Sequence, residues 1–257
     1  MIICCGEALI DMIPTTLDSK ETAFIPKIGG AILNTSICLG RLGANVGFLG
    51  AVSKDLFGEM IFEELNNSKV NTSFCIETSN NTTLAFAKIA NGTTTYSFFD
   101  ENSSNRTICL KDVVLDDSVV DTIYVGGISL MSEPNGTEIE NFIAKESSKK
   151  IVFYDPNVRP NFIEDRSLFI QRFEKILSQS DIIKISEEDL EWLYPNGSFE
   201  EIYKQWLNLS LSIIVLTKGS EGAIIKTKNY EVTSRGEKVE VVDTIGAGDI
   251  FNGALLY

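Results

Sequence analysis

The chain has 257 residues and a formal net charge of −14, with 44% hydrophobic and 23% charged residues. This length allows one large domain with a substantial core, and the composition is that of an ordinary globular protein. The acidic balance argues against nucleic-acid binding, and no apolar run reaches the roughly 18 residues of a membrane span. Because the N-terminus lacks a basic region followed by an apolar stretch, we expect a cytoplasmic protein without membrane partners.

The chain contains no histidine and five cysteines, and the cysteines show no Cys-x-x-Cys spacing. The absence of histidine excludes Ser-His-Asp and Cys-His catalysis together with histidine zinc sites. The cysteine pattern predicts neither a disulfide framework nor a zinc site. Proton abstraction near neutral pH is therefore left to a carboxylate, lysine, tyrosine or cysteine.

The N-terminal half mixes helical and strand patterns. An apolar run over 2–5 predicts a buried strand, and a second strand is expected over 46–52. Helical spacing of apolar residues predicts helices over 31–41 and 55–67. Two strand-rich segments, at about 8–28 and 73–105, interrupt this order, and we expect them to form a small β-sheet lid.

After Asp121, short β-branched runs alternate with amphipathic helices. Strands are expected over 122–125, 151–154, 181–185 and 213–216, and helices over 138–147, 168–177 and 187–193. This alternation is typical of a parallel sheet that is covered on both faces. We therefore predict a single α/β domain over 1–257, with a central, mostly parallel sheet flanked by helices and the small β lid.

A glycine-rich segment near the C-terminal end contains Gly246, Ala247, Gly248 and Asp249. It follows an expected strand over 239–242 and begins a final helix. The first N–H groups of a helix lack internal partners, so small residues there predict an anion hole suited to a phosphoryl group. Asp249 can accept a hydroxyl proton at the same place. With Gly-x-Gly alone, a tight turn with a capping aspartate is the commoner interpretation.

The final helix stops in the middle of its apolar pattern, without a cap or a stop signal. We therefore expect the natural protein to continue beyond Tyr257.

Five segments, in the right order, carry a resemblance to one family. The run 243–249, Asp-Thr-Ile-Gly-Ala-Gly-Asp, resembles the Asp-Thr-x-Gly-Ala-Gly-Asp motif of the ribokinase-like (PfkB) carbohydrate kinases. The other four are Gly-Glu-Ala-Leu-Ile-Asp at 6–11, Gly-Gly-Ala-Ile-Leu-Asn at 29–34, Asp-Pro-Asn-Val-Arg-Pro at 155–160 and Thr-Lys-Gly-Ser-Glu-Gly at 217–222. The first and third of these four are similar to segments of the fructokinase branch. The chain is identified by this resemblance as a ribokinase-like kinase.

The resemblance implies roles for the matching residues. Asp249 would be the catalytic base, and Gly246, Ala247 and Gly248 would donate backbone hydrogen bonds to the transferring phosphate. Arg159 would be a cationic phosphate clamp, with a surface ion pair as the alternative.

Ligand contacts are implied in the same way. Asp11, Gly30 and Asn34 would hold sugar hydroxyls, since carboxylate and carboxamide groups suit paired hydroxyls. Thr217, Gly219 and Gly222 would line the ATP site.

The chain departs from the family pattern at two places. The usual Asn-x-x-Glu linked to Mg²⁺ is replaced by Ser186-Glu187-Glu188-Asp189, so Ser186 would face the nucleotide and Asp189 would hold Mg²⁺ through water. Asp243 and Thr244 are candidates for a monovalent-cation site, which would bind K⁺.

The second departure lies in the predicted lid. Many fructokinase-like members carry an arginine shortly after paired aromatic residues, whereas Phe98-Phe99 are followed here by Asp100. Arg106, a few residues on, is the candidate substitute, so Phe99 and Arg106 are expected to line the sugar site. An acidic Asp100 favours a neutral sugar over an anionic one.

The resemblance implies transfer of the ATP γ-phosphoryl group to a hydroxymethyl group of a free sugar, with D-fructose as the expected acceptor. The alternatives are 2-keto-3-deoxygluconate kinase, ribokinase or nucleoside kinase, and a non-catalytic sugar-binding relative. A nicotinamide dehydrogenase is disfavoured, because no strand–Gly-x-Gly-x-x-Gly–helix unit occurs near the N-terminus. Relatives often dimerise through their lids, so a homodimer formed through the Phe-rich segment 84–99 is also expected.

Overall fold

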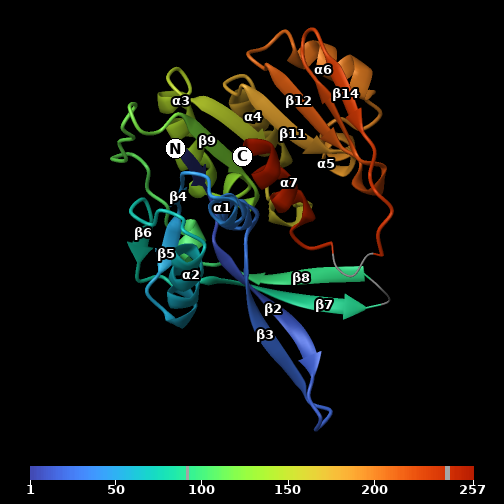
Figure 1. Ribbon diagram of the computed structural model, residues 1–257. Helices are drawn as coiled ribbons and strands as arrows, with labels where there is room; N and C mark the ends of the chain where they lie inside the picture. The colour runs from blue at the N-terminus through green and yellow to red at the C-terminus, as the bar shows by residue number, and fades with distance from the viewer. Residues whose placement is uncertain (91–92, 241–243) are drawn as a thin grey trace.

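The computed structural model describes residues 1–90, 93–240 and 244–257. Its central feature is an eight-stranded sheet (Figure 1). In spatial order its strands are β14 (Glu231–Ser234), β13 (Ala223–Lys226), β12 (Ile213–Thr217), β11 (Ile182–Ser186), β10 (Ile151–Asp155), β9 (Thr122–Gly126), β1 (Ile2–Cys5) and β4 (Val46–Leu49). The six strands from β12 to β4 run parallel, and β13 and β14 extend the sheet antiparallel. The predicted α/β fold with a mostly parallel central sheet is confirmed.

Helices cover both faces of this sheet. Successive side chains of a strand point to opposite faces, so each buried strand contributes to two hydrophobic clusters. In β1, Ile3 and Cys5 belong to one buried cluster and Cys4 belongs to the other. The first cluster lies under α3 (Asn135–Glu146), α4 (Arg166–Leu177), α5 (Glu187–Leu193) and α6 (Phe199–Trp206). The second lies under α1 (Ala31–Leu42), α2 (Leu56–Asn67) and α7 (Ala247–Leu256).

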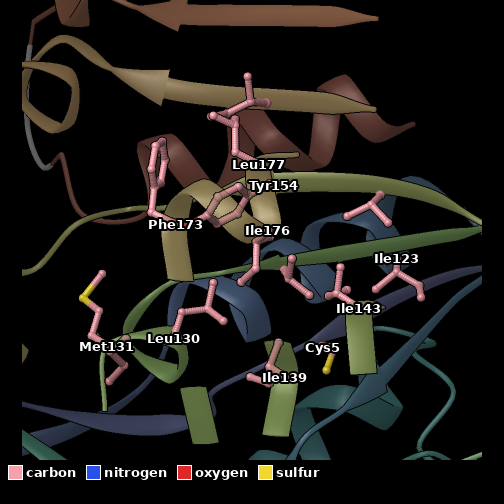
Figure 2. Packing of buried hydrophobic residues seen from close by; sticks show 14 of the residues in the cluster. Cys5, Ile123, Leu130, Met131, Ile139, Ile143, Tyr154, Phe173, Ile176 and Leu177 are labelled. Carbon is pink, nitrogen blue, oxygen red and sulfur yellow. The ribbon is translucent and has the colours of Figure 1, made fainter. Parts of the chain in front are cut away.

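Figure 2 shows the first cluster, where Ile139 and Ile143 of α3 approach strand residues such as Ile123. Tyr154 of β10 packs against Phe173 of α4, with ring centroids 5.7 Å apart. Burying one such side chain contributes about 1.5–3 kcal/mol. The contacts between the predicted strands and helices are therefore major contributions to stability.

A smaller sheet projects from the body (Figure 1). Its order is β3 (Thr22–Gly29), β2 (Leu9–Thr16), β7 (Thr83–Ala90) and β8 (Thr93–Phe99). We call it the lid sheet. The strand β6 (Ile76–Thr78) lies within the predicted lid range but pairs with β5 (Ala51–Ser53) in a separate two-stranded sheet.

The pairing register decides which lid side chains share a face. Asp11 lies opposite Ala85, and Ala85 lies opposite Phe98, so these three side chains form one row on one face. Phe99, one residue further on, points to the other face, where its ring lies 5.3 Å from that of Phe86.

Some boundaries differ from the predicted ones. The expected strand over 46–52 is broken at Gly50, where an added Cβ would lie 2.3 Å from the Gly6 carbonyl oxygen, so the chain needs glycine at this crossing. The expected strand over 239–242 is not seen at Val239 and Glu240, and 241–242 lie outside the described residues. Within the described ranges, no helix has both the length and the apolar character that a membrane crossing requires.

Candidate active site

The predicted site segments meet at one edge of the main sheet. Glu7 follows β1, and Asp155, Ser186 and Thr217 end the neighbouring parallel strands β10, β11 and β12. The carboxyl ends of parallel strands are where open α/β sheets bind ligands. The topology therefore gathers segments that lie far apart in the sequence.

Helices α1 and α7 bring a predicted sugar contact to the predicted base. The Asn34 side-chain amide donates a hydrogen bond to Oδ2 of Asp249 (2.8 Å), and the Thr35 hydroxyl donates to the Asp249 carbonyl oxygen (3.2 Å). The helices approach closely, because a Cβ at Gly253 would lie 2.6 Å from Sγ of Cys38. Figure 1 shows α7 beside α1, over the face opposite the cluster of Figure 2. Asp249 and Asn34 thus form one polar unit.

Asp249 is 7% exposed, and this burial raises the pKa of its carboxyl group above the usual value. The hydrogen bond from Asn34 and the positive charges of Lys184 and Arg159 act in the opposite direction, while the Asp155 charge raises the pKa further. A general base works best when its pKa approaches the working pH. The surroundings of Asp249 therefore suit proton abstraction.

Asp11 joins this group from the lid sheet. Burial and the charge of Asp249 raise the pKa of Asp11 to about 6. A Cβ at Gly29 would lie 2.2 Å from Oδ2 of Asp11, so only glycine leaves room for this carboxylate. Gly30 follows with φ +105° and begins α1. The Asn34 N–H donates to the Gly30 carbonyl oxygen (2.8 Å), so Gly30, Asn34 and Asp249 are linked, and the Asp249 charge acts on Asp11.

Glu7 supports this group, although no role was predicted for it from the sequence. Its buried carboxylate accepts hydrogen bonds from the Ala31 N–H (3.0 Å) and from the Ser129 hydroxyl (2.7 Å). It thereby caps α1, whose own N-cap residue Gly30 offers no side chain. The sequence signal was a single acidic residue directly after a buried strand.

The start of α7 carries the segment that the sequence predicts to be an anion hole. Gly246 adopts φ +76° at the N-cap, and the Ala247 N–H donates to the Thr244 carbonyl oxygen at 3.2 Å. An added Cβ on Gly248 would lie 3.7 Å from Nζ of Lys184, so a buried ammonium group lies beside the first turn. Helix N-termini attract anions. Lys184 was not among the predicted site residues.

The predicted nucleotide residues form turns at the ends of β11 and β12. The Lys218 N–H donates to the Gly222 carbonyl oxygen (2.8 Å), and the Thr217 hydroxyl donates to the Ile185 carbonyl oxygen (3.4 Å). Gly219 and Gly222 have φ values of +52° and +104°, a region that favours glycine. A Cβ at Gly222 would lie 2.0 Å from the Ser234 carbonyl oxygen, so this turn and the strand β14 are in close contact.

Ser186 and Asp189 lie at the start of α5. Oγ of Ser186 accepts a hydrogen bond from the Asp189 N–H (3.0 Å), and Oδ1 of Asp189 accepts one from the Val158 N–H (2.9 Å). The described ranges contain no group of three or more acidic, cysteine or histidine side chains arranged to hold a metal ion. A single carboxylate fits a magnesium ion that is held through water and chiefly by phosphate groups.

Several predicted residues are placed outside these hydrogen-bonded groups or cannot be placed. Thr244 is exposed in the segment just before α7, and Asp243 lies outside the described residues. Arg159 is exposed, and its guanidinium donates to the carbonyl oxygen of Val158 (2.9 Å) within its own loop. Phe99 is 64% exposed on the lid face opposite Asp11.

Phe98 is the aromatic residue that shares the Asp11 face, and its ring packs edge-on against Phe162, with centroids 4.3 Å apart. Arg106 pairs with Asp100 (2.5 Å) and lines a cavity of about 690 Å³ beside Phe98 and Phe162. Neither Asp11 nor Asp249 lines that cavity. In this conformation Arg106 neutralises Asp100 at the base of the lid sheet.

Comparison with known proteins identifies the family. The family model of pfkB family carbohydrate kinases matches residues 1–257. A fructokinase of Rhizobium leguminosarum bv. trifolii is 41% identical over 256 residues, which is 100% of this chain and 78% of the relative. A probable chloroplastic fructokinase-6 of Arabidopsis thaliana is 31% identical and covers 99% of this chain, with 69% of its own length matched.

Solved structures of sugar kinases share the fold of this chain. The fructokinase of Xylella fastidiosa with bound ATP superimposes with a TM-score of 0.91 at 26% identity, covering 99% of this chain and 80% of that one. The aminoimidazole riboside kinase of Salmonella enterica shares the fold, with a TM-score of 0.85 at 21% identity, covering 99% and 82% of the two chains. The fold and the site thus define a ribokinase-like sugar kinase. The chain belongs to the pfkB family of carbohydrate kinases.

Proposed function

We propose that this chain is an ATP-dependent fructokinase, which transfers the γ-phosphoryl group to a hydroxymethyl group of D-fructose and forms fructose 6-phosphate. The observation that carries the proposal is the hydrogen bond between Asn34 and Asp249 at the start of α7. It joins a sugar contact, a base and a helix N-terminus at one point. The 41% identical fructokinase that spans the whole chain supports fructose as the acceptor.

In this proposal the chain positions the sugar and removes its proton. Asp11, Gly30 and Asn34 hold sugar hydroxyls, and Asp249 accepts the proton from the attacking hydroxyl group. The backbone of Gly246, Ala247 and Gly248 stabilises the charge on the transferring group, as preorganised N–H donors do. Arg159 turns from its loop carbonyl groups toward the phosphates when the nucleotide is present.

The nucleotide and its ions complete the proposed site. Thr217, Gly219, Gly222 and Ser186 line the ATP site, and Asp189 holds Mg²⁺ through water. When bound, Mg²⁺ neutralises charge on the phosphate oxygens. We extend the proposal to K⁺ at Thr244 and Asp243.

The lid sheet carries our proposal for the assembly. Phe24 and Phe99 are partly exposed on either side of Phe86, with ring centroids 4.9 Å and 5.3 Å from it. An exposed aromatic face of this kind is typical of an interaction surface. We propose that a second copy covers it in a cytoplasmic homodimer, which light scattering after size-exclusion chromatography would detect as a doubled mass.

A panel of acceptors tests the function. ADP release would be measured with ATP, Mg²⁺ and either fructose, 2-keto-3-deoxygluconate, ribose or adenosine. We expect the highest kcat/KM with fructose. A higher kcat/KM with another sugar would make that sugar the acceptor in place of fructose. The absence of turnover with every sugar would support a non-catalytic relative.

A further inference from the structure

A buried ion pair lies beneath the start of α7. Nζ of Lys184 is 3.0 Å from Oδ2 of Asp155, and the two residues are 4% and 0% exposed. Tyr154 pairs with Ile183 in the sheet, so the next residues, Asp155 and Lys184, are neighbours across β10 and β11. Ile183 and Ile185 belong to the first buried cluster, and alternation directs Lys184 to the opposite face, under α7.

The pair is connected to α7 at two points. The Asn252 side-chain amide donates to Oδ2 of Asp155 (2.7 Å) and lies 3.0 Å from the hydroxyl oxygen of Tyr124. At the first turn of the helix, Nζ of Lys184 lies 3.7 Å from the position that a Cβ on Gly248 would occupy. The helix that carries Asp249 is therefore held to β9, β10 and β11 by one polar network.

This arrangement is unfavourable for folding alone. A positive charge near a helix N-terminus opposes the helix dipole, and burying an ion pair usually stabilises a protein less than apolar packing of the same volume. Conflicts of this kind between local rules and the observed structure are expected at functional sites. For an anion above the helix start, the same ammonium group adds to the attraction of the N–H groups.

We propose that Lys184 is a positioning residue for phosphoryl transfer, which orients the first turn of α7 through Asp155 and adds positive charge beneath the anion hole. The inference rests on the proposed kinase function and deepens it. Lys184 acts on the transferring phosphoryl group and on Asp249 through α7, without contacting the sugar.

The charges around Asp249 make a second effect of Lys184 measurable. Asp11 faces Asp249 from β2, Asp155 faces it from β10, Arg159 from the loop after β10, and Lys184 from β11. Lys184 and Arg159 lower the pKa of Asp249, whereas Asp155 raises it. Removing Lys184 therefore shifts the acidic limb of the kcat profile to higher pH.

The test compares Lys184→Met with Lys226→Met. Lys226 is also a buried lysine, 3% exposed, but it lies on β13 and pairs with Glu231 (3.0 Å) and Glu200, among groups without a site role. We expect K184M to lower kcat at least about tenfold, with the sugar KM within about twofold of wild type. K184R should recover part of kcat, and K226M should lower the unfolding temperature without changing kcat.

Replacing both buried charges with neutral residues distinguishes the effect of Lys184 on catalysis from its effect on stability. In D155N/K184M neither buried charge is left unpaired, so we expect the unfolding temperature to return toward that of wild type while kcat stays low. Full recovery of kcat in this double variant, or wild-type kcat with an unshifted pH profile in K184M, would overturn the role of Lys184. Wild-type turnover with the acceptor panel tests the kinase function separately.

Discussion

The two ends of the site are built in different ways. At the end with the proposed base, Asp249 of α7 is buried against α1 and hydrogen-bonded to Asn34. At the proposed nucleotide end, Thr217 ends β12 and Gly219 lies in the turn that follows, and residues 228–240 are exposed. The first end depends on side chains whose charges are set by burial, whereas the second depends on backbone conformation.

This difference has a chemical reason. A proton acceptor needs a defined pKa, and burial with fixed neighbours sets that pKa. A nucleotide can instead be held by backbone groups at glycine turns, which need space and the correct φ angles more than they need side chains. Substitutions should therefore affect kcat at the first end and the KM for ATP at the second.

The largest effect is expected from Asp249→Asn. The variant keeps the volume and the neighbours of Asp249 but removes the proton acceptor, so kcat should fall at least about a hundredfold with little change in sugar affinity. Steady-state kinetics with fructose and a calorimetric titration of the sugar would measure both. Near-normal turnover in this variant would exclude Asp249 as the base.

Asn34→Ala should have the next largest effect. It removes a sugar contact together with the hydrogen bond that lowers the pKa of Asp249. We expect the fructose KM to rise about tenfold and the acidic limb of kcat/KM to move to higher pH. Asn45→Ala, at an exposed position, is the matched control. An unchanged pH profile in N34A would separate Asn34 from the base.

Gly222→Ala and Gly219→Ala test the nucleotide end. Both positions have positive φ, but only at Gly222 would the added Cβ meet backbone, 2.0 Å from the Ser234 carbonyl oxygen. We expect G222A to raise the ATP KM about tenfold at constant sugar KM, and G219A to lose only about 1 kcal/mol of unfolding free energy. Equal ATP KM values in the two variants would contradict this contact.

The smallest effect is a pH dependence of sugar binding. Burial and the Asp249 charge raise the pKa of Asp11 to about 6, so Asp11 becomes protonated as the pH falls through this value. Protonation removes an acceptor for sugar hydroxyls, and the fructose KM should therefore rise below about pH 6. In D249N the same loss of affinity should occur at lower pH. A flat fructose KM across this range would argue against Asp11 as a sugar contact.

Much of the fold could be predicted because burial leaves a periodic signature. The strand over 2–5 and the helix over 187–193 have the predicted limits, since their apolar spacing and their flanking glycine and serine residues are local signals. The break at Gly50 and the pairing of β6 with β5 had no such signal. They depend on contacts between segments far apart in the sequence.

The site divides in the same way. The order of the glycine-rich motifs and the absence of histidine pointed to Asp249 from the sequence alone. The identity of the lid aromatic did not follow, because a one-residue change of register moves a side chain to the other face and only the strand pairing distinguishes Phe98 from Phe99. Arg106 was predicted to line the sugar site. In the structure it pairs with Asp100, in a cavity that neither Asp11 nor Asp249 lines.

The sequence by itself determined the alternation of strands and helices and the residue types able to transfer a proton and bind phosphate. Both are properties of neighbouring residues, and they follow from spacing and chemistry. The tertiary structure decided the partners: Asn34 for Asp249, and Asp155 for Lys184. Lys184 is a lone lysine in the apolar strand β11, and the sequence does not show which helix packs over it. Only the packing of α7 on the sheet brings that ammonium group to the anion hole.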